Sequence, residues 1–103
     1  MTQTMLRTSE VETSGAKLAV VESGGDGPAV LMIHGNSSCK EVFRNQMQGA
    51  IGAKYRCIAF DLPGHGASSD AYDPENVYTI PGYAALAVEL MEKLGADRYA
   101  VLG

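Results

Sequence analysis

The chain has 103 residues, 46% of them hydrophobic and 19% charged, a composition typical of one soluble globular domain and not of a disordered segment. Its formal net charge is −4 and its basic residues are scattered, so it lacks the basic patch that binds nucleic acid or an anionic membrane. No secretory signal or membrane-spanning run is found in the sequence. We therefore expect a cytoplasmic protein with no nucleic-acid or membrane partner, in which Cys39 and Cys57 are reduced thiols.

The first predicted elements are two short strands, 10–13 and 17–22, on either side of Ser14-Gly15. β-branched residues and a loose alternation favour an antiparallel hairpin here. A cluster of glycines and one proline, residues 24–28, marks a loop. Residues 29–33 are all apolar, as is typical of a strand buried on both faces of a parallel sheet.

A helix is predicted next, because Ser38 and Glu41 fit the S-x-x-E capping box that begins a helix. Its apolar pattern fades within residues 49–52. A second buried strand is predicted over 55–60, and the turn-rich residues 61–78 are predicted to form a long loop.

The clearest helix in the sequence is predicted over residues 79–94. Its apolar residues recur at helical spacing and form one stripe, at Tyr83, Leu86, Ala87, Leu90, Met91 and Leu94. Pro81 is tolerated in the first turn, and Gly95 is a natural residue just past the end. A third buried strand is predicted to begin in the final residues, 98–103.

A hairpin followed by strand, helix, strand, helix and strand predicts an α/β fold with a mostly parallel sheet and flanking helices. In such sheets, ligands bind beyond the carboxyl ends of the strands. Three unusual loops lie at that edge, namely 34–38, 61–69 and whatever follows Gly103.

Three motifs in this order resemble the α/β-hydrolase fold: "HGNSS" at 34–38, "DLPGHG" at 61–66 and "YAVLG" at 99–103. The combination is most similar to lactonases that open N-acyl homoserine lactones. The resemblance implies that residues 1–103 are the amino-terminal part of a single hydrolase domain. In this family the fifth strand leads into the nucleophile elbow G-x-S-x-G, whose first glycine would be Gly103. The nucleophile, acid and histidine of the triad would then all lie past Gly103, and the 103 residues alone are expected to be inactive.

The resemblance assigns the loop after the third strand to the oxyanion hole, where backbone N–H groups stabilise the charge that develops on the reacting carbonyl. It implies that the N–H of Asn36 is one donor, and that Gly35 and Ser37 bind substrate. Asn36 could instead be only a turn residue. His34 is expected to brace this loop and not to act in catalysis.

Asp61, Gly64, His65 and Gly66 of "DLPGHG" are interpreted as structural residues near the site. Pro63-Gly64 fits a type II turn, Gly66 permits a second bend, and Asp61 can accept loop N–H bonds. His34 and His65 have no evident third partner for a metal site, so no metal and no cofactor is expected.

The function that the resemblance implies is hydrolysis of a small-molecule ester or lactone by a serine nucleophile. One alternative is a haloalkane dehalogenase-like hydrolase with an aspartate nucleophile, although such enzymes usually carry proline where Ser37 stands. Another is a non-catalytic binding protein that keeps the fold. The sequence leaves the oligomeric state open.

Overall fold

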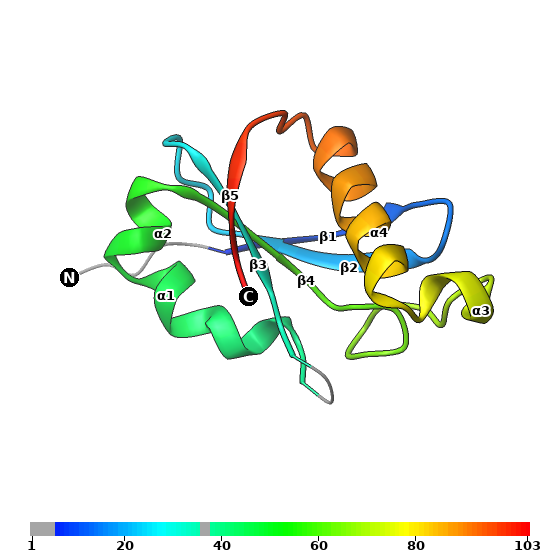
Figure 1. Cartoon of the computed structure of the whole chain (residues 1–103). Helices are drawn as coiled ribbons and strands as arrows, with labels where there is room; N and C mark the ends of the chain where they lie inside the picture. Colours follow the sequence, from blue (N-terminus) through cyan, green and yellow to red (C-terminus); the bar gives the residue numbers. More distant parts are fainter. Residues whose placement is uncertain (1–5, 36–37) are drawn as a thin grey trace.

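The computed structural model describes residues 6–35 and 38–103, and its strands form one five-stranded sheet in the order β1-β2-β4-β3-β5 (Figure 1). The strands are β1 Arg7–Glu12, β2 Lys17–Glu22, β3 Ala29–Ile33, β4 Arg56–Phe60 and β5 Tyr99–Leu102. β3 lies between β4 and β5 and is parallel to both, whereas β2 is antiparallel to β1 and β4. The predicted α/β architecture is therefore confirmed.

The predicted hairpin is present, but its first strand is longer than predicted. β1 begins at Arg7 and pairs with β2 along its whole length, from Arg7↔Glu22 to Glu12↔Lys17. Almost all of β1 is exposed, so no apolar pattern marked where it begins. Its length is set by pairing with β2.

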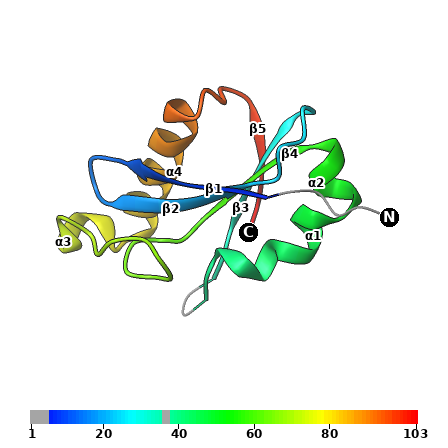
Figure 2. The ribbon, with the colours of Figure 1, turned by 180° about the vertical axis from the view of Figure 1, so that it is seen from behind.

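Helices cover the sheet on two sides (Figure 2). Side chains alternate between the faces, so Leu31 belongs to the cluster that includes Leu90 of helix α4 (Ile80–Lys93), while its neighbour Met32 packs with Met47 of helix α1 (Arg44–Gln48). This pattern of two buried faces is what the all-apolar run of β3 predicted.

Helix α4 matches its prediction closely. The Thr79 hydroxyl accepts a hydrogen bond from the N–H of Gly82 at 2.9 Å and so caps the first turn. Gly95 follows the last turn with φ +76°, a left-handed conformation that favours glycine. The buried face is formed by Leu86, Ala87, Leu90 and Met91.

The helix predicted from the capping box is wrong in two respects. Three short pieces replace it: a 3₁₀ helix η1 (Lys40–Phe43), α1, and α2 (Ala50–Lys54). Cys39, not Ser38, occupies the N-cap position of η1, and its side chain makes no capping hydrogen bond. Glu41 pairs instead with the ammonium of Lys40, 2.9 Å away. Gly49 is extended and separates α1 from α2, in keeping with the low helix propensity of glycine.

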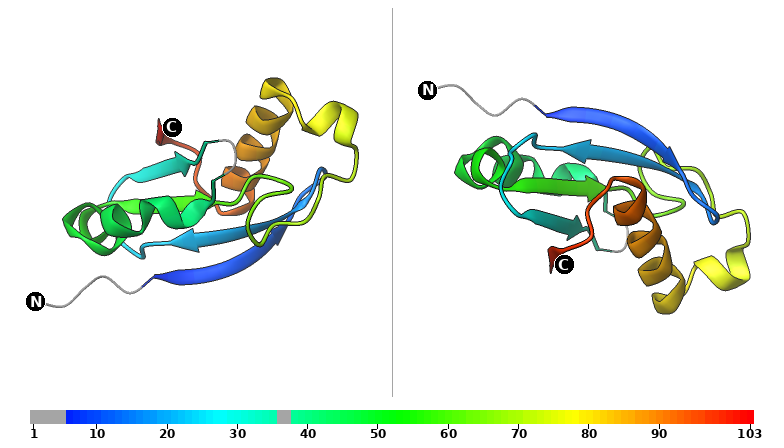
Figure 3. Two further views of the ribbon diagram at one scale, coloured as in Figure 1. Left: turned by 90° about the horizontal axis from the view of Figure 1, so that it is seen from below. Right: turned by 90° about the horizontal axis from the view of Figure 1, so that it is seen from above.

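Two further differences concern the second half of the chain. The predicted loop 61–78 contains a one-turn helix, α3 (Pro74–Val77), which begins at a proline pre-set for the first helical position. β5 has the apolar run of a buried strand, but within the described residues it pairs with β3 alone at the edge of the sheet (Figure 3), and Val101 is 60% exposed.

Across the described ranges, no helix combines the length and apolar character needed to cross a membrane.

Candidate active site

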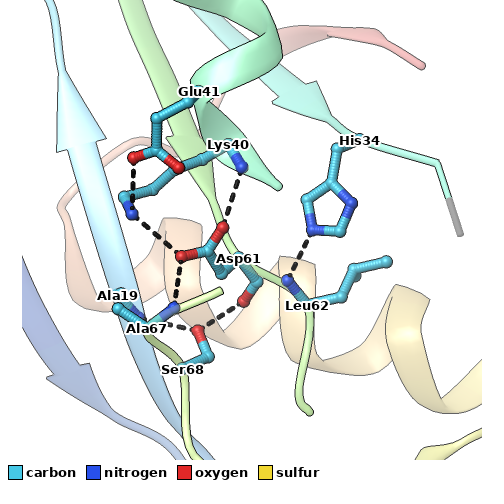
Figure 4. Close-up of polar contacts among 8 residues, drawn as sticks. All are labelled: Ala19, His34, Lys40, Glu41, Asp61, Leu62, Ala67 and Ser68. Atoms are coloured by element: carbon cyan, nitrogen blue, oxygen red, sulfur yellow. Dashed lines mark hydrogen bonds and ion pairs between the residues drawn. The ribbon is translucent and has the colours of Figure 1, made fainter. Parts of the chain in front are cut away.

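The carboxyl ends of β3 and β4 bring the first two predicted loops together. Ile33, the last residue of β3, pairs with Phe60, the last residue of β4. His34 therefore lies beside Asp61 and Leu62, as Figure 4 shows. This is the edge at which the sheet topology predicted a ligand site.

The His34 side chain is 4% exposed and both of its ring nitrogens are engaged. Nε2 accepts a hydrogen bond from the backbone N–H of Leu62 at 3.0 Å. Nδ1 lies 2.7 Å from the carbonyl oxygen of Gly35, which can only accept, so Nδ1 carries the proton and the ring is neutral. No nitrogen of this ring is free to take a proton from a substrate.

Asp61 is the most densely bonded side chain at this edge, and it is fully buried. Its Oδ1 accepts from the backbone N–H of Lys40 at 2.8 Å, and its Oδ2 accepts from Lys40 Nζ at 2.8 Å and from the N–H of Ala67 at 2.9 Å (Figure 4). Burial alone raises the pKa of a carboxyl, but the hydrogen bonds from Lys40 and Ala67 outweigh it and hold the pKa of Asp61 below its ordinary value. The group is therefore a carboxylate.

Lys40 is the residue that the sequence did not reveal. Its side chain is 10% exposed, and its ammonium bridges the carboxylates of Asp61 and Glu41. Burial lowers the pKa of a lysine, but the hydrogen bonds to these carboxylates outweigh it and raise the pKa of Lys40. No local sequence pattern indicates this pairing, because Lys40 and Asp61 lie 21 positions apart.

The loop after β4 is folded around the Asp61 carboxylate. The N–H of His65 donates to the carbonyl of Leu62 at 2.9 Å across a turn in which Gly64 has φ +75°, so the predicted type II turn is present. Gly66 has φ +49°, and a Cβ there would lie 2.4 Å from the carboxylate of Asp61. Glycine is required at Gly66 both for its backbone conformation and for space.

Ser68 joins this loop to the neighbouring strand. Its hydroxyl donates to the carbonyl oxygen of Asp61 at 2.6 Å and accepts from the N–H of Ala19 at 2.8 Å.

The His65 ring lies with its centroid 5.2 Å from that of His34, and its Nδ1 donates to the carbonyl of Pro63 at 3.0 Å. No cluster of three or more metal-ligating side chains occurs among residues 6–35 and 38–103.

An open cavity of about 600 Å³ adjoins this network. It lies between the carboxyl ends of β3 and β4 and the first turn of α4, and most of its wall is apolar. Its lining comprises Ile33, His34, Gly35, Phe60, Leu62, Tyr78, Thr79, Ile80, Tyr83 and Ala84.

Of the predicted substrate-binding and oxyanion residues, the structure describes only Gly35. Gly35 lines the cavity, and a Cβ there would meet nothing within 4 Å. Asn36 and Ser37 lie outside the described residues, and their roles stay predictions. Gly103 is exposed, beyond the end of β5.

Comparison with known proteins finds relatives over nearly the whole chain. The family model for the alpha/beta hydrolase fold matches residues 28–103. Epoxide hydrolase A of Mycobacterium tuberculosis is 35% identical over 96 residues, which cover 90% of this chain and 29% of the relative. Haloalkane dehalogenase 2 of Mycobacterium bovis is 31% identical over 93 residues, covering 89% of this chain and 31% of the relative.

Solved structures give a closer match. N-acyl homoserine lactonase AidH in complex with N-butanoyl homoserine superposes with a TM-score of 0.92 at 49% identity, over 94% of this chain and 35% of that protein. A mutant of AidH in complex with N-hexanoyl homoserine gives a TM-score of 0.94 at 48% identity. Epoxide hydrolase VrEH1 of Vigna radiata gives 0.81 at 30% identity. The chain spans about a third of the length of each of these proteins.

Proposed function

The chain belongs to the α/β-hydrolase fold family, and from that premise we propose that it is the amino-terminal part of a hydrolase that opens ester or lactone bonds, with N-acyl homoserine lactones as the first substrates to test. The observation that carries this proposal is the match to the lactonase AidH, at 48–49% identity and TM-scores of 0.92–0.94. The epoxide hydrolases and the dehalogenase are about 30–35% identical.

In the proposed reaction, a serine beyond Gly103 attacks the carbonyl carbon of the substrate. The carbonyl oxygen then carries negative charge, which two backbone N–H groups stabilise, each worth about 10²–10³ in rate. The N–H of Asn36 is the donor that this part of the protein supplies, and Gly35 and Ser37 adjoin the substrate. The intermediate then collapses with cleavage of the C–O bond to the alcohol, which takes up the proton that the serine gives up, and water releases the acyl group from the serine as the acid.

The described residues support the proposal in two ways. The apolar cavity beside His34 and Gly35 suits an acyl chain, because burial of methylene groups favours binding by about 0.8 kcal/mol each. His34 has both ring nitrogens engaged, which agrees with a nucleophile and base that lie elsewhere in the protein. A cytoplasmic location and the absence of a cofactor stay predictions.

A serine nucleophile is also supported by a further structure of AidH. In that structure a mutant with glycine in place of a serine is in complex with N-hexanoyl homoserine lactone. A lactone that keeps its ring in the absence of a serine is what nucleophilic attack by serine predicts.

The first test is to read the natural gene past Gly103 and to assay the complete protein. We expect serine at the second position beyond Gly103, within G-x-S-x-G, and release of acid from N-hexanoyl homoserine lactone and short-chain p-nitrophenyl esters. Turnover of epoxides or haloalkanes with none of lactones or esters would overturn the proposal. A gene without a nucleophile at that place would favour a binding protein.

A dehalogenase-like reaction is the second candidate, favoured by the relatives of that name, and one substitution separates the two. A serine hydrolase with Asn36→Ala should keep most of its kcat, because the backbone N–H survives the change. A dehalogenase would lose the side-chain amide that holds halide. A thousandfold loss of kcat in a folded variant would therefore contradict the oxyanion role.

A further inference from the structure

The connection between β3 and η1 is held at both of its ends by two consecutive residues that follow β4. At its beginning, the His34 ring accepts the N–H of Leu62 at 3.0 Å. At its end, Lys40 donates both its backbone N–H and its Nζ to the carboxylate of Asp61, each at 2.8 Å. Figure 4 shows the two contacts side by side on the same strand end.

We propose that Lys40 is a positioning residue for the hydrolytic reaction, which acts by locking the start of η1 onto Asp61 at the end of β4. The proposal rests on the proposed function, because the proposed oxyanion donor precedes η1 in the sequence by a few residues. Lys40 itself touches no reacting atom.

The geometry of the contact favours positioning over simple cohesion. Two hydrogen bonds from one residue to the two oxygens of one carboxylate restrict orientation as well as distance. The carboxylate is itself held by the N–H of Ala67, and the Asp61 carbonyl is held by Ser68. Preorganised donors lose much of their effect when they are displaced by a fraction of an ångström, so a rigid mount matters for catalysis.

A buried ion pair such as Lys40–Asp61 is not expected to add much to stability. Desolvation of two charges offsets most of their attraction, and an apolar pair of similar size is often as stable. A buried Lys–Asp pair at the edge of a candidate active site therefore agrees better with a role in geometry.

The chain offers a matched control, an ion pair at the opposite end of β4 from Asp61. Arg56, the first residue of β4, donates its Nε to Glu22 at 3.0 Å. This pair is partly buried, with the two side chains 28% and 14% exposed, and it lies at the amino end of the strand. Arg56→Met removes this ion pair and the hydrogen bond from Arg56 Nη2 to the carbonyl oxygen of Leu94 at 2.9 Å, without touching the carboxyl edge of the sheet.

The test compares Lys40→Met, Lys40→Arg and Arg56→Met in the complete protein expressed from the natural gene. Lys40→Met should lower kcat for ester or lactone hydrolysis at least tenfold with KM changed less than twofold, because a misplaced oxyanion donor weakens only the transition state. Loss of a whole donor costs about 10²–10³ in rate and sets the upper bound. Lys40→Arg should restore most of kcat, and Arg56→Met should leave kcat unchanged.

A second readout does not depend on activity. Hydrogen exchange of a peptide covering residues 34–43 should accelerate in Lys40→Met but not in Arg56→Met, both measured under conditions where the protein stays folded. If Lys40→Met fails to fold, Lys40→Gln replaces it, because its amide is uncharged and one bond shorter than the lysine side chain, and the same loss of kcat and faster exchange are expected.

The outcomes separate the two proposals. A natural protein that hydrolyses no ester or lactone overturns the proposed function, and exchange of the 34–43 peptide then decides whether Lys40 fixes this connection. Full kcat in folded Lys40→Met, or equal losses in Lys40→Met and Arg56→Met, overturns the positioning role while the hydrolase stands. Unchanged exchange in the 34–43 peptide also overturns it.

Discussion

The carboxyl end of β4 and the strand β5 differ in how completely the described residues surround them. Past the end of β4, Asp61 is fully buried and surrounded by hydrogen-bond donors, and backbone turns are folded around its carboxylate. On β5, Val101 and Leu102 are 60% and 47% exposed to solvent among the described residues. One region is over-determined by polar contacts, while the other has an apolar surface without cover in this chain.

Cross-strand partners make the contrast sharper. Leu31 of β3 pairs with Val101 of β5, and paired residues of parallel strands point to the same face. Leu31 is 1% exposed and Val101 is 60% exposed. The difference therefore comes from what lies over each side chain and not from the direction in which it points.

Asp61→Asn should have the largest effect on stability. The amide keeps the shape of the carboxyl but leaves the buried ammonium of Lys40 without its main counter-ion, so we expect the free energy of unfolding to fall by about 3–5 kcal/mol. Urea unfolding of the complete protein measures this. The control is Glu22→Gln, which removes the β2 partner of Arg56 in a more exposed ion pair and is expected to cost about 1 kcal/mol or less. Equal losses of unfolding free energy in Asp61→Asn and Glu22→Gln would show that the buried contacts of Asp61 add no more stability than a more exposed ion pair.

Gly66→Ala should rank second. Alanine at φ +49° costs about 1–2 kcal/mol for its left-handed conformation, and the new Cβ also pushes against the Asp61 carboxylate. Gly95→Ala is the matched control, because Gly95 has φ +76° but a Cβ there meets nothing within 4 Å. We expect Gly66→Ala to be at least 1 kcal/mol more costly than Gly95→Ala by urea unfolding. Equal losses of unfolding free energy in the two variants would show that the Asp61 carboxylate moves aside for the new Cβ without cost.

These regions also show how far sequence reasoning reaches. The apolar runs of β3 and β4 and the stripe of α4 were predictable, because burial on both faces requires a continuous apolar run and burial of one helix face requires an apolar stripe at helical spacing. The turn at Gly64 was predictable for a similar reason, since proline followed by glycine fits one turn type. Each of these features depends on residues a few positions apart.

The Lys40–Asp61 pair was not predictable, because it depends on tertiary packing of two residues 21 positions apart. The prediction of one helix from the capping box was wrong for a local reason: Ser38 and Glu41 have the residue types of a capping box, but Glu41 pairs with the neighbouring Lys40. Exposure of β5 depends on what covers the strand, and no residue within β5 determines that. At the candidate site, the sequence indicated Asp61 and His34 but not the lysine next to them.

The pH dependence of the free energy of unfolding should show how much the ionised forms of Asp61 and Lys40 stabilise the end of β4. The pKa of Asp61 lies below its ordinary value of 3.8, so its contribution is complete above that pH and is lost as pH falls toward the lower pKa of the folded state. The pKa of Lys40 lies above its ordinary value of 10.5, so its contribution is complete below that pH and is lost at higher pH.

The gap in unfolding free energy between the natural protein and Asp61→Asn should therefore stay constant from about pH 5 to pH 9. It should narrow below about pH 4. Urea midpoints across this range measure the gap, and a gap that widens on acidification would mean that the pKa of Asp61 is raised and not lowered.

Val101→Thr should have the smallest effect, and it tests the other end of the comparison. A side chain that stays 60% exposed tolerates a hydroxyl within about 0.5 kcal/mol. If the protein continues past Gly103 as a hydrolase, however, further chain must cover the α4 side of β5, and the hydroxyl is then buried against apolar neighbours. On that proposal we expect Val101→Thr to cost about 1–2 kcal/mol in the complete protein, measured by urea unfolding beside Val42→Thr, which changes another exposed valine on η1. Equal and negligible costs at the two valines would leave β5 an uncovered edge, and a nucleophile elbow built directly on its end would then lack the packed support that such a strained turn requires.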